Sequence, residues 1–161
     1  MIWRASILAF AVLCGFTGAQ VPEFSQQYVQ RLGGAVDALA QVVSDFDASA
    51  SASGLSRQEA LEQMQGTDFL DRRRRDMART FLRFERLSAQ LEALQTAPAL
   101  QRAASIARAP DGEVARATFA VFQPGLPLSK DGLLFGLSGA LAGLGVAGLM
   151  GRLFRRGRAT A

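Results

Sequence analysis

The feature that most constrains this chain is an uncharged apolar run near its C-terminal end, GLLFGLSGALAGLGVAGLMG over residues 132–151. A helix needs about 20 such residues to cross the hydrocarbon core of a bilayer. Glycine disfavours helices in water, whereas in lipid small residues let helices approach closely. The run therefore predicts a transmembrane helix. Its packing surface is predicted at two GxxxG pairs, Gly132 with Gly136 and Gly139 with Gly143. Apolar filler without a packing role remains the alternative, because GxxxG alone is a weak pattern.

A second apolar run, over residues 2–21, carries one charge, at Arg4. Two interpretations stay open: a retained transmembrane helix, or a signal peptide cleaved after Ala19. A row of small residues in this run is placed to face the glycines of the second span: Ala11, Gly15 and Ala19. The only cysteine of the chain, Cys14, also lies here, so an intrachain disulfide is excluded.

The charges are distributed unevenly. All fourteen acidic residues and thirteen of the eighteen basic residues lie between Glu23 and Asp131, which gives that stretch a net charge of −1. The basic tail over residues 152–161 carries four arginines and no acid. Because cytoplasmic flanks are enriched in basic residues, we expect both termini in the cytoplasm and residues 22–131 in the periplasm of a bacterial inner membrane. The nearly neutral middle also argues against binding of nucleic acid, which needs a basic face.

The middle stretch predicts an all-helical domain, because no segment alternates with the period of a strand. We expect a first helix to begin at Pro22 and a small-residue segment, residues 48–54, to break it. Its apolar seam is expected at Phe24, Tyr28, Leu32, Ala35, Leu39, Val42 and Phe46. That seam is typical of a short coiled coil or of an ordinary amphipathic helix.

Polar caps and prolines predict where the remaining helices begin and end. A capping box at Ser56 and Glu59 begins a short helix, and Thr67 or Asp68 caps a long one that runs to about Thr96. Two further short helices are expected, one between Pro98 and Pro110 and one before Pro124. The apolar face of the long helix is expected at Leu70, Met77, Phe81, Phe84 and Leu91.

Arginines dominate one face of the long helix. This arginine strip consists of Arg72, Arg75, Arg79, Arg83 and Arg86, at spacings of three and four residues. One hypothesis is that the strip binds anionic lipid headgroups or an acidic partner. The other is a solvated face, because Asp68 and Asp71 each precede an arginine by four residues and partly neutralise it.

Signatures of catalysis are missing from the sequence. There is no histidine, which is the commonest general base and metal ligand. No glycine-rich phosphate loop, nucleophile with a nearby histidine or metal-ligand cluster is present either. We therefore expect no enzymatic activity and no bound cofactor.

Two blocks of the chain resemble a family of uncharacterised proteobacterial membrane proteins that share a domain of unknown function. The blocks are PEFSQQYVQRL over residues 22–32 and LSRQEAL over residues 55–61. The resemblance covers nearly the whole chain and implies two terminal apolar helices, the first of them retained. It implies no activity and no catalytic residue.

The first block also places polar residues just outside the predicted membrane boundary, at Glu23, Gln26, Gln27, Gln30 and Arg31. They form a candidate contact surface, or they bond to headgroups and neighbouring helices.

Together these features predict an interaction or scaffold protein, as an accessory subunit of an envelope complex or as a homo-oligomer in contact with membrane lipids. The alternative is a transport component for lipids or solutes. It would need polar groups between the spans, where only Ser6, Thr17 and Ser138 occur.

Overall fold

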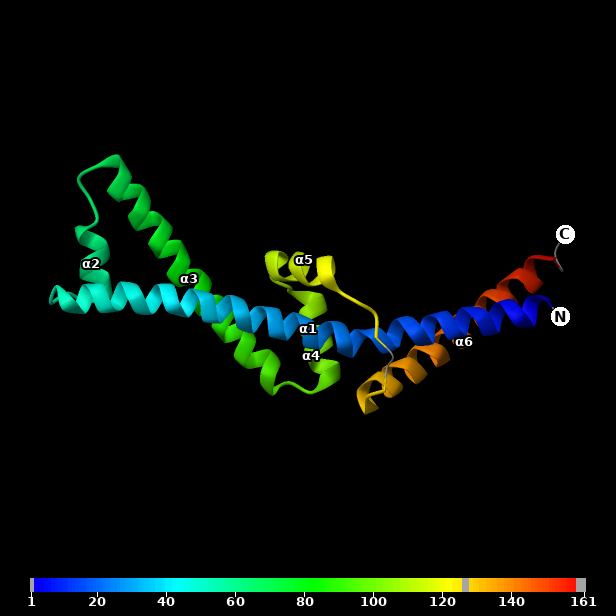
Figure 1. Ribbon diagram of the computed structural model, residues 1–161. Coiled ribbons are helices and arrows are strands. Elements are labelled where there is room, and N and C mark those ends of the chain that lie inside the picture. Colours follow the sequence, from blue (N-terminus) through cyan, green and yellow to red (C-terminus); the bar gives the residue numbers. More distant parts are fainter. Residues whose placement is uncertain (1, 126–127, 159–161) are drawn as a thin grey trace. The chain divides into compact units, whose positions relative to one another are not determined.

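The computed structural model describes residues 2–125 and 128–158, with side chains over residues 5–125 and 128–151 (Figure 1). The side chains of the predicted basic tail, residues 152–161, lie outside these ranges. Over the described residues the regular structure is entirely α-helical, which confirms the predicted all-α class. The helices are α1 (Ile2–Ala52), α2 (Arg57–Gln63), α3 (Asp68–Thr96), α4 (Ala99–Arg108), α5 (Gly112–Val121) and α6 (Lys130–Arg158).

Local capping sets the ends of the shorter helices, as predicted. Ser56 begins α2 through a capping box: its side chain accepts from the N–H of Glu59, whose carboxylate accepts from the N–H of Ser56 at 2.8 Å. The hydroxyl of Thr67 accepts from the N–H of Leu70 and begins α3. Between these two helices Gly66 adopts a φ of 101°, a conformation that side chains disfavour. Each of these ends is therefore decided by residues within a few positions.

Helix α1 is longer than the sequence pattern predicts. The expected helix start at Pro22 is wrong, because one helix runs through it, whereas the expected break over residues 48–54 is confirmed, since α1 ends inside that segment at Ala52. A proline removes one backbone hydrogen bond, but α1 is packed on both sides of it, at Ala19 and Tyr28. In the serine-rich segment, the hydroxyls of two serines donate to carbonyls four residues earlier, a local bond that serine can make without leaving the helix.

The chain divides into two compact units. The paired-helix unit comprises Met1–Gln27, Pro98–Ala109 and Thr118–Ala161, and the bundle unit comprises Tyr28–Ala97 and Pro110–Ala117. Helices α1 and α5 each contribute to both units. The stretch 22–131, predicted as one extramembrane domain, is therefore shared between them.

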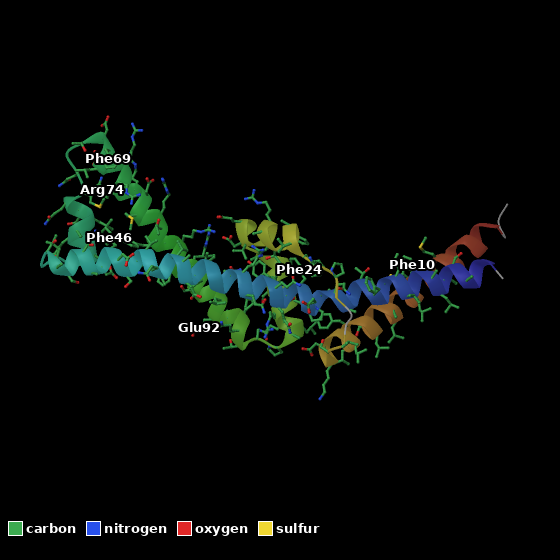
Figure 2. All side chains as sticks on the ribbon, viewed as in Figure 1. Phe10, Phe24, Phe46, Phe69, Arg74 and Glu92 are labelled. Atoms are coloured by element: carbon green, nitrogen blue, oxygen red, sulfur yellow. The ribbon has the colours of Figure 1, made fainter. Side chains whose placement is uncertain are left out.

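The core of the bundle unit lies where α1 meets α3. Val43, Met77 and Phe81 are buried together. The side chains packed around them are Phe46, Leu61 and Phe84, with Phe46 labelled in Figure 2. The rings of Phe46 and Phe81 meet edge to face, 5.2 Å apart. Burial of large apolar side chains is thus what holds this unit together.

The buried faces differ in detail from the predicted ones. Tyr28 and Leu32 are fully buried as expected. Val42, however, is 43% exposed, and the neighbouring Val43, which is only 5% exposed, is buried instead. Successive helix residues are about 100° apart. Val43 is thus about 20° from Leu32 around the axis, while Val42 is about 80° away on the other side. On α3 the prediction also missed Leu87, which is fully buried.

Candidate functional site

Glycines form the contact between α1 and α6, which run antiparallel side by side in the paired-helix unit (Figure 1). A Cβ added at Gly139 would lie 2.5 Å from the carbonyl oxygen of Cys14, and one added at Gly18 would lie 2.7 Å from that of Phe135. Real Cβ atoms essentially never come so close to another heavy atom. At these positions the two backbones therefore meet at a separation that only glycine permits.

Three of the four predicted packing glycines of α6 lie at this contact. Gly136, Gly139 and Gly143 face α1, and Gly132 is buried at the start of α6. On α1 the predicted row Ala11, Gly15 and Ala19 is buried. Gly18, one residue outside that row, was missed, although it makes one of the closest approaches. A spacing rule selects one row of small residues, whereas two crossing helices bring neighbouring rows into contact.

Large apolar side chains of the same helices point outward instead of into the pair. The most exposed of them are Leu8, Val12, Leu13, Leu134, Leu137, Leu141 and Leu149, each between 61% and 70% exposed. In the described part of the chain, two helices are long and apolar enough to cross a membrane, over Ala5–Ala52 and Lys130–Gly151. The described residues leave much of the outward apolar surface of these helices uncovered.

A polar cluster centres on Asp111 in the bundle unit. The Asp111 carboxylate, whose side chain is 8% exposed, accepts from Arg86 at 3.1 Å and from Arg83 at 3.5 Å. It also accepts from the backbone N–H groups of Glu113 and Val114 at the start of α5. One carboxylate thus both caps α5 and ties that helix to α3.

Tyr28 completes this cluster from α1. Its hydroxyl accepts from the backbone N–H of Asp111 at 2.8 Å and also bonds to the side chain of Gln90. Burial raises the pKa of the Tyr28 phenol. Burial also acts to raise the pKa of the Asp111 carboxyl, but the Val114 N–H and the Arg83 charge outweigh it and lower that pKa below its usual value. The cluster therefore favours a neutral phenol beside an ionised carboxylate.

Some arginines of the arginine strip bind this cluster, and the others do not. Arg83 and Arg86 bind Asp111, and Arg83 also binds Glu113 at 2.8 Å. Arg79 pairs with Asp76. At the start of α3, Asp71 pairs with Arg74 instead of the predicted Arg75.

Three arginines remain at the start of α3. Among the described residues, no ion pair joins a carboxylate to Arg72, Arg73 or Arg75. Phe69, which is labelled in Figure 2, lies three residues before Arg72 and is 70% exposed. The candidate surface is therefore formed by these three arginines in the second turn of α3, and not by the whole arginine strip.

The polar residues of the 22–32 block separate into two groups. Glu23 and Gln26 line a pocket of about 130 Å³ in the paired-helix unit, together with Gly125, Leu128 and Ser129 among others. The side-chain amide of Gln27 donates to Glu23 at 3.0 Å.

Arg31 lies in the other unit, where it lines an open pocket with Arg83 and Glu113. Gln30 is exposed. The block therefore does not form one continuous surface within either unit.

No cation-binding cluster of three or more His, Cys, Asp or Glu side chains occurs in the described part of the chain. The sequence matches a family described as protein of unknown function, DUF2937, over residues 2–160. The chain belongs to the DUF2937 family. This match confirms the resemblance to an uncharacterised family and extends over both apolar helices of this DUF2937 member. No curated protein and no solved structure matches the sequence.

Proposed function

We propose that this DUF2937 protein is an integral protein of the bacterial inner membrane, anchored by α1 and α6, that acts as an interaction or scaffold subunit. The observation that carries the proposal is the reversed packing of the two helices. Glycine and alanine face inward while leucine, valine and phenylalanine face outward. A pair of helices in water buries its large apolar side chains, because their burial drives association. The reversed arrangement suits a hydrocarbon solvent.

The same contacts support retention of the first helix over cleavage after Ala19. Ala11, Gly15 and Ala19 are buried in the paired-helix unit, and Gly18 is in near-backbone contact with α6. Cleavage would remove this partner surface and leave the glycines of α6 uncovered. Intact mass of the membrane-extracted chain tests this point. The full-length mass is expected, and a chain that lacks residues 1–19 would contradict retention.

The antiparallel pairing supports the predicted orientation, in which both basic ends lie in the cytoplasm. A reporter that is active only in the cytoplasm should be active when fused after Ala161. The same reporter inserted at Gly66, an exposed loop position, should be inactive. Activity at both positions would contradict periplasmic exposure of the bundle unit.

The interaction role is supported by Arg72, Arg73 and Arg75, the three arginines of α3 that no carboxylate of the described residues pairs. They lie in the second turn of α3, next to the positive end of the helix dipole, which disfavours cations. Their mutual repulsion adds to that cost. An anionic surface on a partner would offset it through charge-assisted hydrogen bonds.

A pull-down of C-terminally tagged protein from its own membrane, in mild detergent, tests the role. The expected result is a second protein, or further copies of this chain, in fixed stoichiometry. Substitution of Arg72, Arg73 and Arg75 together by glutamine should lower the recovery of that partner. Arg79→Gln, which removes an arginine already paired with Asp76, is the matched control. A chain recovered alone, or recovery unaffected by the triple substitution, would contradict the proposed surface.

The transport alternative gains no specific observation. Thr17 and Ser138 are exposed, and the hydroxyl of Thr17 donates to the carbonyl of Leu13 in its own helix.

A further inference from the structure

We propose that one edge of the paired-helix unit, where Phe119 and Leu128 are exposed, is a collar that rests on the bilayer and inserts between lipid headgroups. This interfacial collar takes in the end of α5 and Leu128, which lies two residues before α6. The proposal rests on the membrane anchoring proposed above and adds a second lipid-binding surface to it.

Gln20 fixes the position of the collar along α1. The side-chain amide of Gln20 donates to the carbonyl of Gly125 at 3.2 Å, and its side-chain oxygen accepts from the N–H of Gly125 at 3.1 Å. Gln20 lies in the last turn of the apolar run over residues 2–21. These two bonds hold Gly125 beside the point on α1 at which the apolar run ends.

Aromatic contacts hold the end of α5 at nearly the same position along α1. The ring of Phe24, one turn after Gln20 on α1, lies 4.5 Å from the ring of Phe119 and 5.6 Å from that of Phe122. Phe119 nevertheless remains 67% exposed. One side of this ring is therefore packed against α1, and the described residues leave the rest uncovered.

The exposed surface of the collar is apolar and uncharged. Leu128 is 86% exposed. No charged residue occurs over residues 117–129, between Arg116 and Lys130. Beside Leu128, the pocket wall is polar, with Glu23, Gln26 and Ser129. Apolar tips next to polar groups match the boundary between acyl chains and headgroups.

Lipid fits this surface better than a second protein for two reasons. The collar is continuous along the chain with α6, whose outward face is itself apolar. It also carries no charge with which a soluble partner would be recognised. Exposure of these two side chains to water is unfavourable, and insertion at the interface removes that cost.

Tryptophan fluorescence in lipid nanodiscs tests the collar. Trp3 is the only tryptophan, so Trp3→Phe gives a background without fluorescence from that residue. Three substitutions are then compared in this background: Phe119→Trp in the collar, Leu137→Trp on the outward face of α6, and Leu82→Trp in the bundle unit. Leu82 has the same 67% exposure as Phe119, which makes it the matched control. Leu128→Trp repeats the collar measurement at a second position.

The expected result is blue-shifted emission from the two collar variants, Phe119→Trp and Leu128→Trp, that lipids brominated near the headgroup quench strongly. Emission from the α6 variant, Leu137→Trp, should be quenched best by bromine deep in the acyl chains. Emission from the bundle variant, Leu82→Trp, should be quenched by neither kind of lipid.

Other outcomes separate failure of the collar from failure of the anchoring. Collar variants as unquenched as the bundle variant, with the α6 variant still quenched, would overturn the collar alone. Blue-shifted collar emission without quenching would mean that protein covers the collar, and would also overturn the proposal. An unquenched α6 variant would overturn the membrane anchoring itself.

Discussion

The two units of this chain are built from similar helices but place opposite kinds of side chain inside. In the paired-helix unit, glycines such as Gly18 and Gly139 form the contact, while Leu141 is 69% exposed. In the bundle unit, Phe81 and Leu87 are buried and arginines occupy the surface. Burial of large apolar area in water contributes about 25 cal/mol per Å². Lipid offers no such gain, and close backbone approach is needed instead. The inward-facing residue type thus supports a different solvent for each unit.

The largest expected effect comes from filling the glycine contact. Gly139→Val should destabilise the paired helices by about 3 kcal/mol. The new Cβ would clash with the backbone carbonyl of Cys14, which cannot move aside as a flexible side chain could. Gly145→Val is the control, since a Cβ there meets nothing within 4 Å. The readout is the temperature at which Cys14, which faces Gly143, reacts with a maleimide in detergent. Equal midpoint temperatures for Gly139→Val and Gly145→Val would show that the paired-helix unit does not depend on close glycine contacts.

The second effect tests whether the bundle unit depends on its buried carboxylate. Asp111→Asn should cost about 2 to 3 kcal/mol, because it leaves Arg86 without its anionic partner and Arg83 with only the exposed Glu113. Glu113→Gln is the control, because the Glu113 side chain is 72% exposed and such pairs contribute under about 1 kcal/mol. Urea unfolding followed by circular dichroism measures both variants. A similar loss from both would mean that Asp111 is no more than a surface charge.

The third prediction concerns pH and follows from the lowered pKa of Asp111. In the unfolded chain this carboxyl is protonated below about pH 4, while in the folded chain it stays ionised to lower pH. The stability that Asp111 contributes is therefore fully present above about pH 4 and is lost as pH falls through the folded pKa. The difference in unfolding free energy between wild type and Asp111→Asn should be constant from neutral pH and shrink below about pH 4. A difference that grows in acid would contradict the assignment.

The smallest effect is local to α2. Ser56→Ala should cost about 1 kcal/mol, because it removes the acceptor for the N–H of Glu59. Amide hydrogen exchange over α2 measures the loss, since this helix contains no fully buried residue and opens by itself. Ser51→Ala, at an exposed position of α1, should leave exchange in α2 unchanged. An effect of Ser56→Ala on the maleimide reaction of Cys14 would mean that the two units are not energetically separate.

Much of the helical layout could be predicted because its determinants are local. Ser56, Thr67 and Pro98 mark helix starts that the structure confirms. Pro22 misled the prediction, because a local rule for helix starts takes no account of packing on both sides of the proline. Val42 misled it because spacings of three and four place either valine on a seam, and only the neighbouring helix decides between them.

The two apolar runs, the glycine rows and the helix caps can all be read from the amino-acid order, because each depends on residues a few positions apart. Which polar groups meet was settled only by the packing of the helices. Tyr28 and Asp111 are 83 positions apart, and neither stands out in its own segment. The cluster around them separates the arginines that bind Asp111 from those at the start of α3. A long-range contact depends on how whole helices pack, and no periodicity within one helix encodes it.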